Sequence, residues 1–220
     1  TAQTLEPATS SAQKTSLSSV RDRMTHLAGK RPELVAIGIS TGGPNALQFL
    51  LAELPENLNL PVVIVQHMPP GFTGALASRL DESCALHVKE AQDLEPLMPN
   101  VVYLAPGGRQ MKVERIDDSI VLRITDDPAE NHCKPSVDYL FRSVAESFPA
   151  RAIGIIMTGM GNDGALGTRT LRQTGCITIA QDMGSCVVFG MPKEAIQLGA
   201  IDIIVPLNKI AEEICKRVFQ

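Results

Sequence analysis

The chain has 220 residues, of which 44% are hydrophobic and 20% are charged, and its formal net charge at pH 7 is −4. This length and composition favour one large soluble domain with a substantial core. The acidic balance, the absence of tryptophan and an aromatic content of 4% argue against nucleic acid as a partner, because nucleic-acid-binding proteins usually present basic patches and stacking rings.

The cysteines and the hydropathy pattern indicate a cytoplasmic protein. Five cysteines occur, an odd number, and no pair has C-x-x-C spacing, which is typical of thiols in a reducing compartment. No apolar run approaches the roughly 20 residues that cross a bilayer, and no signal-peptide core precedes residue 30, so we expect no membrane insertion. The histidines and cysteines show no zinc-ligand spacing, so we expect neither metal nor cofactor.

The first part of the chain differs from the rest. Residues 1–31 are rich in Ser, Thr, Ala and Gln and contain few large apolar residues. Such a segment buries too little surface to offset its ordering entropy, so we interpret it as an interdomain linker, and we expect another domain upstream. Residues 20–33 could form a short helix.

From residue 32 to 220, short apolar runs alternate with amphipathic stretches, which predicts a single α/β domain. The predicted strands are, in chain order, 34–39, 61–66, 85–90, 101–104, 110–116, 120–125, 152–157, 177–180 and 201–205. The predicted helices are 44–54, 73–82, 136–147, 165–174, 193–198 and 207–218.

This order of elements predicts a doubly wound, mostly parallel sheet. Several strands are apolar throughout, as expected where helices cover both faces of a sheet. One interruption stands out: 110–116 and 120–125 are joined by Asp117-Asp118-Ser119, which predicts an antiparallel hairpin inserted into the fold.

Three loops at predicted strand ends carry candidate chemistry, because ligands of open α/β sheets bind beyond the carboxyl ends of the strands. The first loop, 38–44, contains G-x-S-x-G around Ser40, the spacing of a nucleophile elbow. The alternative is a glycine-rich turn in which Ser40 only caps the next helix.

The second loop begins at His67, one of four histidines in the chain. A histidine at a strand end is often structural. Beside a candidate serine, however, an imidazole can accept the hydroxyl proton near pH 7 and return it to a leaving group.

The third loop, 158–164, contains Asp163 and also matches G-x-G-x-x-G at Gly159, Gly161 and Gly164. This spacing is typical of dinucleotide-binding sites, so a Rossmann-like nucleotide site stays open as an alternative. Asp163 argues against it, because a carboxylate repels pyrophosphate at a helix N-terminus. The same carboxylate could orient an imidazole.

Together the loops supply a nucleophile, a base and an acid, so Ser40, His67 and Asp163 are the candidate catalytic triad. The chain order Ser, His, Asp differs from that of α/β hydrolases, which makes membership of that superfamily doubtful. A domain that keeps these residues but only docks another protein is a further alternative.

Six segments of the domain resemble the catalytic domain of the chemotaxis protein-glutamate methylesterases, the CheB family. They lie in the same order along the chain as in the family. The segments are IGISTGGP at 37–44, VQHMPPGFT at 65–73, YLAPGG at 103–108, PSVDYLF at 135–141, MTGMGNDGA at 157–165 and TIAQDMGSCVVFGMPKEAI at 178–196.

The resemblance implies a doubly wound α/β fold with the hairpin near one end, and hydrolysis of glutamyl methyl esters on the cytoplasmic helices of chemoreceptors. Some family members also deamidate receptor glutamines. By motif, Ser40 corresponds to the nucleophile, His67 to the base and Asp163 to the orienting acid, with Thr41 and Met160 beside them. For the oxyanion we expect backbone N–H groups of Thr41 and of the turn at Met160 and Gly161.

Family enzymes usually carry an N-terminal receiver domain that blocks the site until it is phosphorylated. The resemblance therefore implies that this chain is a catalytic fragment, active without phosphorylation. Two positions depart from the family pattern: Arg109-Gln110 follows APGG, and Cys133-Lys134 precedes PSVD with His132 one place earlier. We expect both departures to alter the cleft rim without touching the triad.

Overall fold

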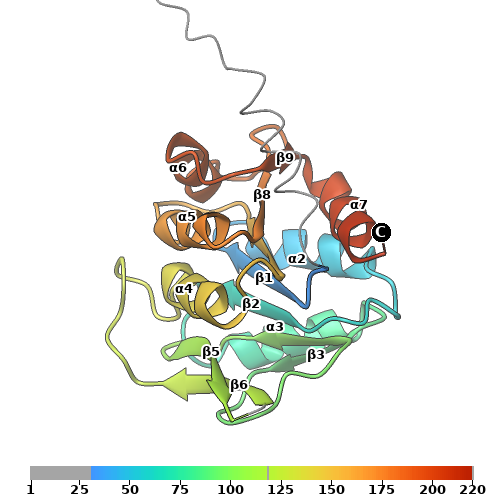
Figure 1. Ribbon diagram of the computed structural model, residues 1–220, viewed down its shortest axis with the longest axis vertical. Coiled ribbons are helices and arrows are strands. Elements are labelled where there is room, and N and C mark those ends of the chain that lie inside the picture. The colour runs from blue at the N-terminus through green and yellow to red at the C-terminus, as the bar shows by residue number, and fades with distance from the viewer. Residues whose placement is uncertain (1–30, 118, 220) are drawn as a thin grey trace, which may run out of the picture.

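The computed structural model describes residues 31–117 and 119–219 of the chain. Residues 1–30 of the predicted linker and most of the short helix predicted at 20–33 lie outside these residues. The described part has one central sheet with helices on both faces and a separate hairpin, as Figure 1 shows. The predicted fold class is confirmed.

The central sheet has seven parallel strands in the order β3-β4-β2-β1-β7-β8-β9. The strands are β1 Leu34–Ile39, β2 Val62–Gln66, β3 His87–Glu90, β4 Val101–Leu104, β7 Ala152–Ile156, β8 Ile177–Gln181 and β9 Ile203–Val205. Strands β1, β2, β7 and β8 are buried along their whole length, which explains why their sequences are apolar or uncharged throughout instead of alternating.

Helices form one layer on each face of the sheet (Figure 1). One layer contains α2 Gly43–Ala52, α3 Thr73–Asp81 and α7 Leu207–Val218, and the other contains α4 Val137–Ser147, α5 Ala165–Gln173 and α6 Met191–Gln197. Successive residues of β1 face opposite layers: Val35 and Ile37 pack with the first layer, and Leu34 and Ala36 with the second. Burial of each such Val, Leu or Ile side chain contributes about 1.5–3 kcal/mol.

The hairpin lies near the β3–β4 end of the sheet, as the family resemblance implied. Its strands, β5 Gln110–Ile116 and β6 Ser119–Thr125, pair in antiparallel register. The amide of Val113 donates to Ser143 Oγ of α4, and the backbone of Leu122 pairs with the segment that follows β3 through Leu94 and Glu95. The hairpin therefore braces α4 against that edge of the domain.

The sheet changes winding direction between β1 and β7. Helix α2 carries the chain from β1 to β2 on one face, whereas α5 carries it from β7 to β8 on the other face. Helices that diverge in this way open a crevice above the carboxyl ends of the strands. The loops that follow β2, β1 and β7 therefore meet at one place.

Several element ends differ from the predictions by one or two residues. Ser136, predicted inside a helix, precedes α4, where its side chain accepts a hydrogen bond from the amide of Tyr139. Strand β9 begins at Ile203 and not at 201, because the Asp202 side chain binds Arg172 and Thr178.

Within the described part of the chain, no helix is long and apolar enough to span a membrane.

Contact between β1 and α4 depends on Gly38. A Cβ atom at this position would lie 2.2 Å from Cγ1 of Val137, the first residue of α4. We predict that Gly38→Ala lowers the free energy of unfolding by about 1–3 kcal/mol, because β1 and α4 must move apart. Urea denaturation measures this change.

Gly74→Ala is the matched control, because a Cβ atom there has no neighbour nearer than 3.6 Å and the residue lies in helix α3. Equal effects of the two substitutions would contradict the close-packing explanation.

Candidate active site

Backbone hydrogen bonds join the three strand ends that carry the candidate residues. Ser40 directly follows β1, and its amide donates to the carbonyl oxygen of Thr158 after β7, at 2.9 Å. His67 directly follows β2, and its amide donates to the carbonyl oxygen of Ile39 at the end of β1, at 3.1 Å. The sheet thus places the Ser40, His67 and 158–164 segments side by side.

The loop after β1 turns at glycine and not at serine. Gly42 has φ of 83° and precedes helix α2, whereas Ser40 is not among the described non-glycine residues with positive φ. Ser40 is half-buried and Thr41 is exposed. The G-x-S-x-G spacing therefore produces a strand-to-helix turn without the strained serine of a nucleophile elbow.

Gln66, which the sequence analysis did not single out, ties the serine loop to the histidine. It is buried at the end of β2, and its Nε2 donates to the carbonyl oxygens of Ser40 and His67, both at 3.0 Å. A Cβ atom on Gly43 would collide with Gln66 Oε1 at 1.8 Å, so only glycine leaves room for this amide. The arrangement keeps the backbones of Ser40 and His67 at a constant separation.

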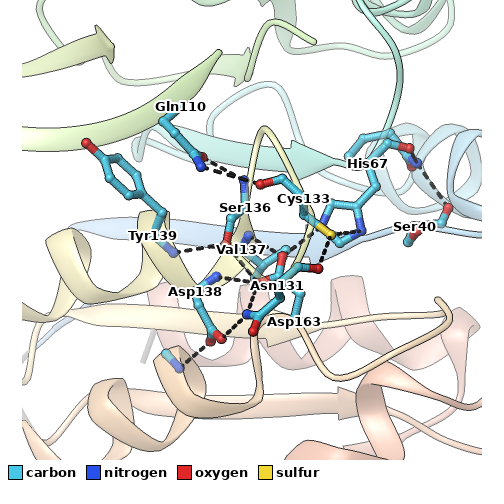
Figure 2. Close-up of polar contacts among 12 residues, drawn as sticks. Ser40, His67, Gln110, Asn131, Cys133, Ser136, Val137, Asp138, Tyr139 and Asp163 are labelled. Atoms are coloured by element: carbon cyan, nitrogen blue, oxygen red, sulfur yellow. Dashed lines mark hydrogen bonds and ion pairs between the residues drawn. The ribbon is translucent and has the colours of Figure 1, made fainter. Parts of the chain in front are cut away.

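Asp163 is 2% exposed and accepts five hydrogen bonds (Figure 2). The donors are His67 Nε2 at 2.7 Å, Asn131 Nδ2 at 2.9 Å, Ser136 Oγ at 2.7 Å, and the amides of Val137 at 2.7 Å and Asp138 at 3.2 Å. A buried carboxylate is costly unless hydrogen bonds replace its water, and here five donors do so.

Three of these donors belong to the N-terminus of helix α4. Ser136 is its N-cap, and Val137 and Asp138 are its first residues, whose amides have no partner within the helix. A helix N-terminus carries partial positive charge, so it stabilises the carboxylate of Asp163. Asp163 lies just before α5 in the chain, but the helix N-terminus that donates hydrogen bonds to its carboxylate is that of α4.

A second buried carboxylate lies beside the first. Asn131 Nδ2 bridges Asp163 Oδ1 and Asp138 Oδ2, each at 2.9 Å, and the amide of Gly167 donates to Asp138 Oδ1. Burial raises the pKa of Asp138, and the negative charge of Asp163 adds to this. A single amide group therefore holds together two carboxyl groups that would otherwise repel each other.

His67 lies between Ser40 and Asp163 in the view of Figure 2. Because the Asp163 carboxylate only accepts, Nε2 of His67 carries the proton, and Nδ1 is left for other partners. Burial lowers the pKa of His67, but hydrogen bonds to Asp163 and Cys133 outweigh this effect and raise the pKa to about 9. Burial acts to raise the pKa of Asp163, and the hydrogen bonds from His67 and Asn131 outweigh it, so that pKa is lowered.

The expectation that the two departures from the family pattern would not touch the triad is wrong for Cys133. Its Sγ lies 3.8 Å from Nδ1 of His67. The loop that carries Cys133 turns back over His67, because Asn131 and His132 adopt left-handed φ of 50° and 62°.

The other departure from the family pattern, Gln110, is buried and forms hydrogen bonds with the loop that carries Cys133. Its Nε2 donates to the carbonyl oxygens of Pro128 and Cys133, and its Oε1 accepts from the amide of Ser136. Gln110 thus holds both the Cys133 loop and the N-cap of α4 in place.

The residues predicted to bind an oxyanion lie at the open side of the site. Thr41, Met160 and Gly161 are exposed. Within residues 31–117 and 119–219, their backbone N–H groups donate to no protein atom. They are therefore free to bind a ligand oxygen.

The sequence analysis assigned no supporting role to five residues: Gln66, Gln110, Asn131, Ser136 and Asp138. A serine before a helix with an acidic residue in its first turn, as at Ser136 and Asp138, is a readable helix-start signal. What that helix start binds is not readable, since Asp163 lies 27 residues from Ser136 in the chain.

Comparisons with known proteins agree with this geometry. Residues 35–214 match the family described as CheB methylesterase. A solved structure, the CheB methylesterase catalytic domain of Thermotoga maritima, is 40% identical with a TM-score of 0.82, covering 85% of this chain and 99% of that one.

Two curated relatives are named protein-glutamate methylesterase/protein-glutamine glutaminase. The relative from Desulfotalea psychrophila is 53% identical, covering 84% of this chain and 51% of its own length, and that from Escherichia coli O157:H7 is 46% identical, covering 84% and 53%. The chain thus spans about half the length of the curated relatives it matches.

The nucleotide-binding alternative gains no support. The matched family is a methylesterase family, and the Asp163 carboxylate within the glycine-rich loop accepts hydrogen bonds from His67 and α4. A carboxylate at that position would repel a pyrophosphate.

The raised pKa of His67 is directly testable. We predict that Asp163→Asn lowers the pKa of His67 from about 9 toward the ordinary histidine value of 6.5, because the lowering effect of burial then acts without the opposing carboxylate. NMR titration of the imidazole protons measures this, with the His67 signals identified by their loss in His67→Gln. Asp81→Asn, which removes an exposed carboxylate outside the site, serves as the control; a shift of His67 in that variant would contradict the assignment.

The N-cap serine has both a structural and an electrostatic role. We predict that Ser136→Ala lowers the free energy of unfolding by about 1–2 kcal/mol, because the helix loses its cap and the Asp163 carboxylate loses a donor. Urea denaturation tests this against Ser78→Ala, whose hydroxyl donates only to a carbonyl oxygen of its own helix. No difference between the two variants would overturn the prediction.

Proposed function

Because the chain belongs to the CheB methylesterase family, we propose that it hydrolyses glutamyl methyl esters of chemoreceptors, with Ser40, His67 and Asp163 as its catalytic triad. The observation that carries this proposal is the buried hydrogen bond of 2.7 Å between His67 Nε2 and Asp163 Oδ2, next to the strand end that bears Ser40. A carboxylate that orients an imidazole beside a serine is the arrangement that activates a serine hydroxyl.

We infer from the orientation of His67 that Nδ1 carries out the proton transfer. Nε2 is engaged by Asp163, so the lone pair of Nδ1 accepts the Ser40 proton as the hydroxyl oxygen attacks the ester carbonyl. The Asp163 carboxylate then stabilises the imidazolium. Gln66, whose side-chain amide donates hydrogen bonds to the backbone carbonyls of Ser40 and His67, holds the two residues in position during the transfer.

The negative charge of the tetrahedral intermediate requires donors already aimed at it. The unpaired N–H groups of Thr41, Met160 and Gly161 are the candidates, and each such donor is typically worth about 3 kcal/mol in the transition state. On collapse of the intermediate the methoxide group leaves, takes the proton from His67 and departs as methanol. Water then attacks the acyl-enzyme by the same route and leaves a glutamate side chain.

The same acyl chemistry with ammonia as the leaving group would deamidate receptor glutamines. We propose that the substrate is the cytoplasmic helical part of a methylated chemoreceptor, so that the enzyme acts in the cytoplasm. In the full-length protein, a receiver domain would control access to the site, as the family resemblance implies.

The nucleophile is tested by methanol release from a methylated chemoreceptor fragment. We predict that Ser40→Ala lowers kcat by at least about 10³-fold while the protein remains folded, because no other group replaces the attacking oxygen. Ser78→Ala, on the exposed side of α3, should retain the parent rate. A Ser40→Ala rate equal to that of the parent would exclude the proposed mechanism, and a folded parent without turnover would favour a catalytically silent docking module.

The pH dependence of kcat/KM follows from the raised pKa of His67. Below its pKa the imidazolium cannot accept the Ser40 proton, so we predict that kcat/KM falls about tenfold per pH unit below about pH 9. In Asp163→Asn the fall should begin at lower pH, although the maximum rate is reduced. A profile that falls only below pH 6.5 in the parent would show that another group controls the reaction.

A further inference from the structure

His67 has a second polar neighbour that the proposed esterase reaction does not use. Cys133 Sγ lies 3.8 Å from Nδ1, the ring nitrogen that does not bind Asp163. The ligand atoms of His67, Cys133 and Asp163 all lie within 4.8 Å of one another. We propose that this cluster binds a zinc ion, held by His67 Nδ1 and Cys133 Sγ, and that the ion inhibits hydrolysis.

The separation of the two donor atoms suits tetrahedral zinc. With a Zn–N distance of about 2.0 Å and a Zn–S distance of about 2.3 Å, a tetrahedral angle places the nitrogen and sulfur about 3.5 Å apart. The observed separation of 3.8 Å is close to this value. Imidazole and thiolate are also the ligands that favour zinc over magnesium or calcium.

Asp163 accepts a hydrogen bond from the ring nitrogen of His67 that would not bind zinc, and so orients the imidazole. Its carboxylate accepts the Nε2 proton of His67, so Nδ1 is the ring nitrogen that remains for a metal ion. Zinc-bound histidines almost always donate their other ring N–H to a carboxylate, carbonyl or water in this way. The hydrogen bonds from α4 and Asn131 keep this carboxylate in position.

Zinc also has an open route to the two donors. A cleft of about 280 Å³ is lined by His67, Met68, Pro69 and residues 132–135, so both donors border it. Lys134, the cation in this cleft wall, pairs with Asp126 at 2.7 Å. The cleft leaves space for water molecules in the remaining coordination positions, and His132 borders it as well.

Inhibition follows from competition for one lone pair. Zinc on Nδ1 takes the electrons that would accept the Ser40 proton, so the metal-bound protein cannot activate the serine. This consequence rests on the proposed function, whereas binding itself does not. On binding, the Cys133 thiol and the His67 imidazolium each release a proton to solvent, and no electron transfer occurs.

Binding is tested on the full chain with Co²⁺ and Zn²⁺ alone, without substrate. Co²⁺ should produce a thiolate-to-metal absorption band, and Zn²⁺ should displace it. Cys133→Ala should remove the band and weaken Zn²⁺ binding, measured by competition with a chromophoric chelator, by at least about tenfold. Cys84→Ala should leave both unchanged, because Cys84 Sγ donates to Leu80 and Leu86 carbonyl oxygens elsewhere in the fold.

Inhibition is tested by methanol release before and after zinc addition, with each variant compared to its own metal-free rate. The parent and Cys84→Ala should lose activity and recover it with a chelator, and Cys133→Ala should resist the same zinc concentration. A missing thiolate band, or equal zinc affinity in the parent and folded Cys133→Ala, overturns the site. If metal-free protein releases no methanol, the proposed function fails, and the cobalt spectrum still decides the metal site.

Discussion

The buried carboxylate of Asp163 is the interaction on which the arrangement of the site depends. An unpaired charge at this depth would cost several kcal/mol, so the structure must bring donors to it. The donors come from three separate parts of the chain: the end of β2, the loop at Asn131 and the start of α4. Folding of these parts is therefore coupled through one negative charge, and His67 is oriented as one of its donors.

The same hydrogen bond decides what the imidazole can do. Because Nε2 is bound to Asp163, Nδ1 is the ring nitrogen left for proton transfer or metal binding. Cys133 Sγ lies 3.8 Å from it. One lone pair then serves two purposes, proton acceptance from Ser40 and metal binding, and the two exclude each other. The cysteine at this position makes the second possibility available, because sulfur and imidazole nitrogen together suit zinc.

The sheet contributes rigidity and position. Ser40 and His67 each follow a buried parallel strand directly, and Asp163 lies in the loop after β7. The strands β2, β1 and β7 are neighbours, and the winding of the chain reverses between β1 and β7. Two buried side-chain amides, Gln66 and Gln110, hold the loops to this frame by hydrogen bonds. Function-bearing loops are thus held by hydrogen bonds from the sheet and the hairpin, while their outer residues stay open to a substrate.

The sequence by itself determined the elements and the three chemistry-bearing loops. Apolar runs and amphipathic periods mark strands and helices through local side-chain patterns, and the segments around Ser40, His67 and Asp163 stand out at strand ends. Only the tertiary structure decided which groups surround them. Asn131, Ser136 and Cys133 reach Asp163 and His67 through a loop that folds back over the sheet. These pairs are separated by 27 to 66 residues, and no local pattern encodes a contact that depends on where a crossover helix begins and how a loop turns.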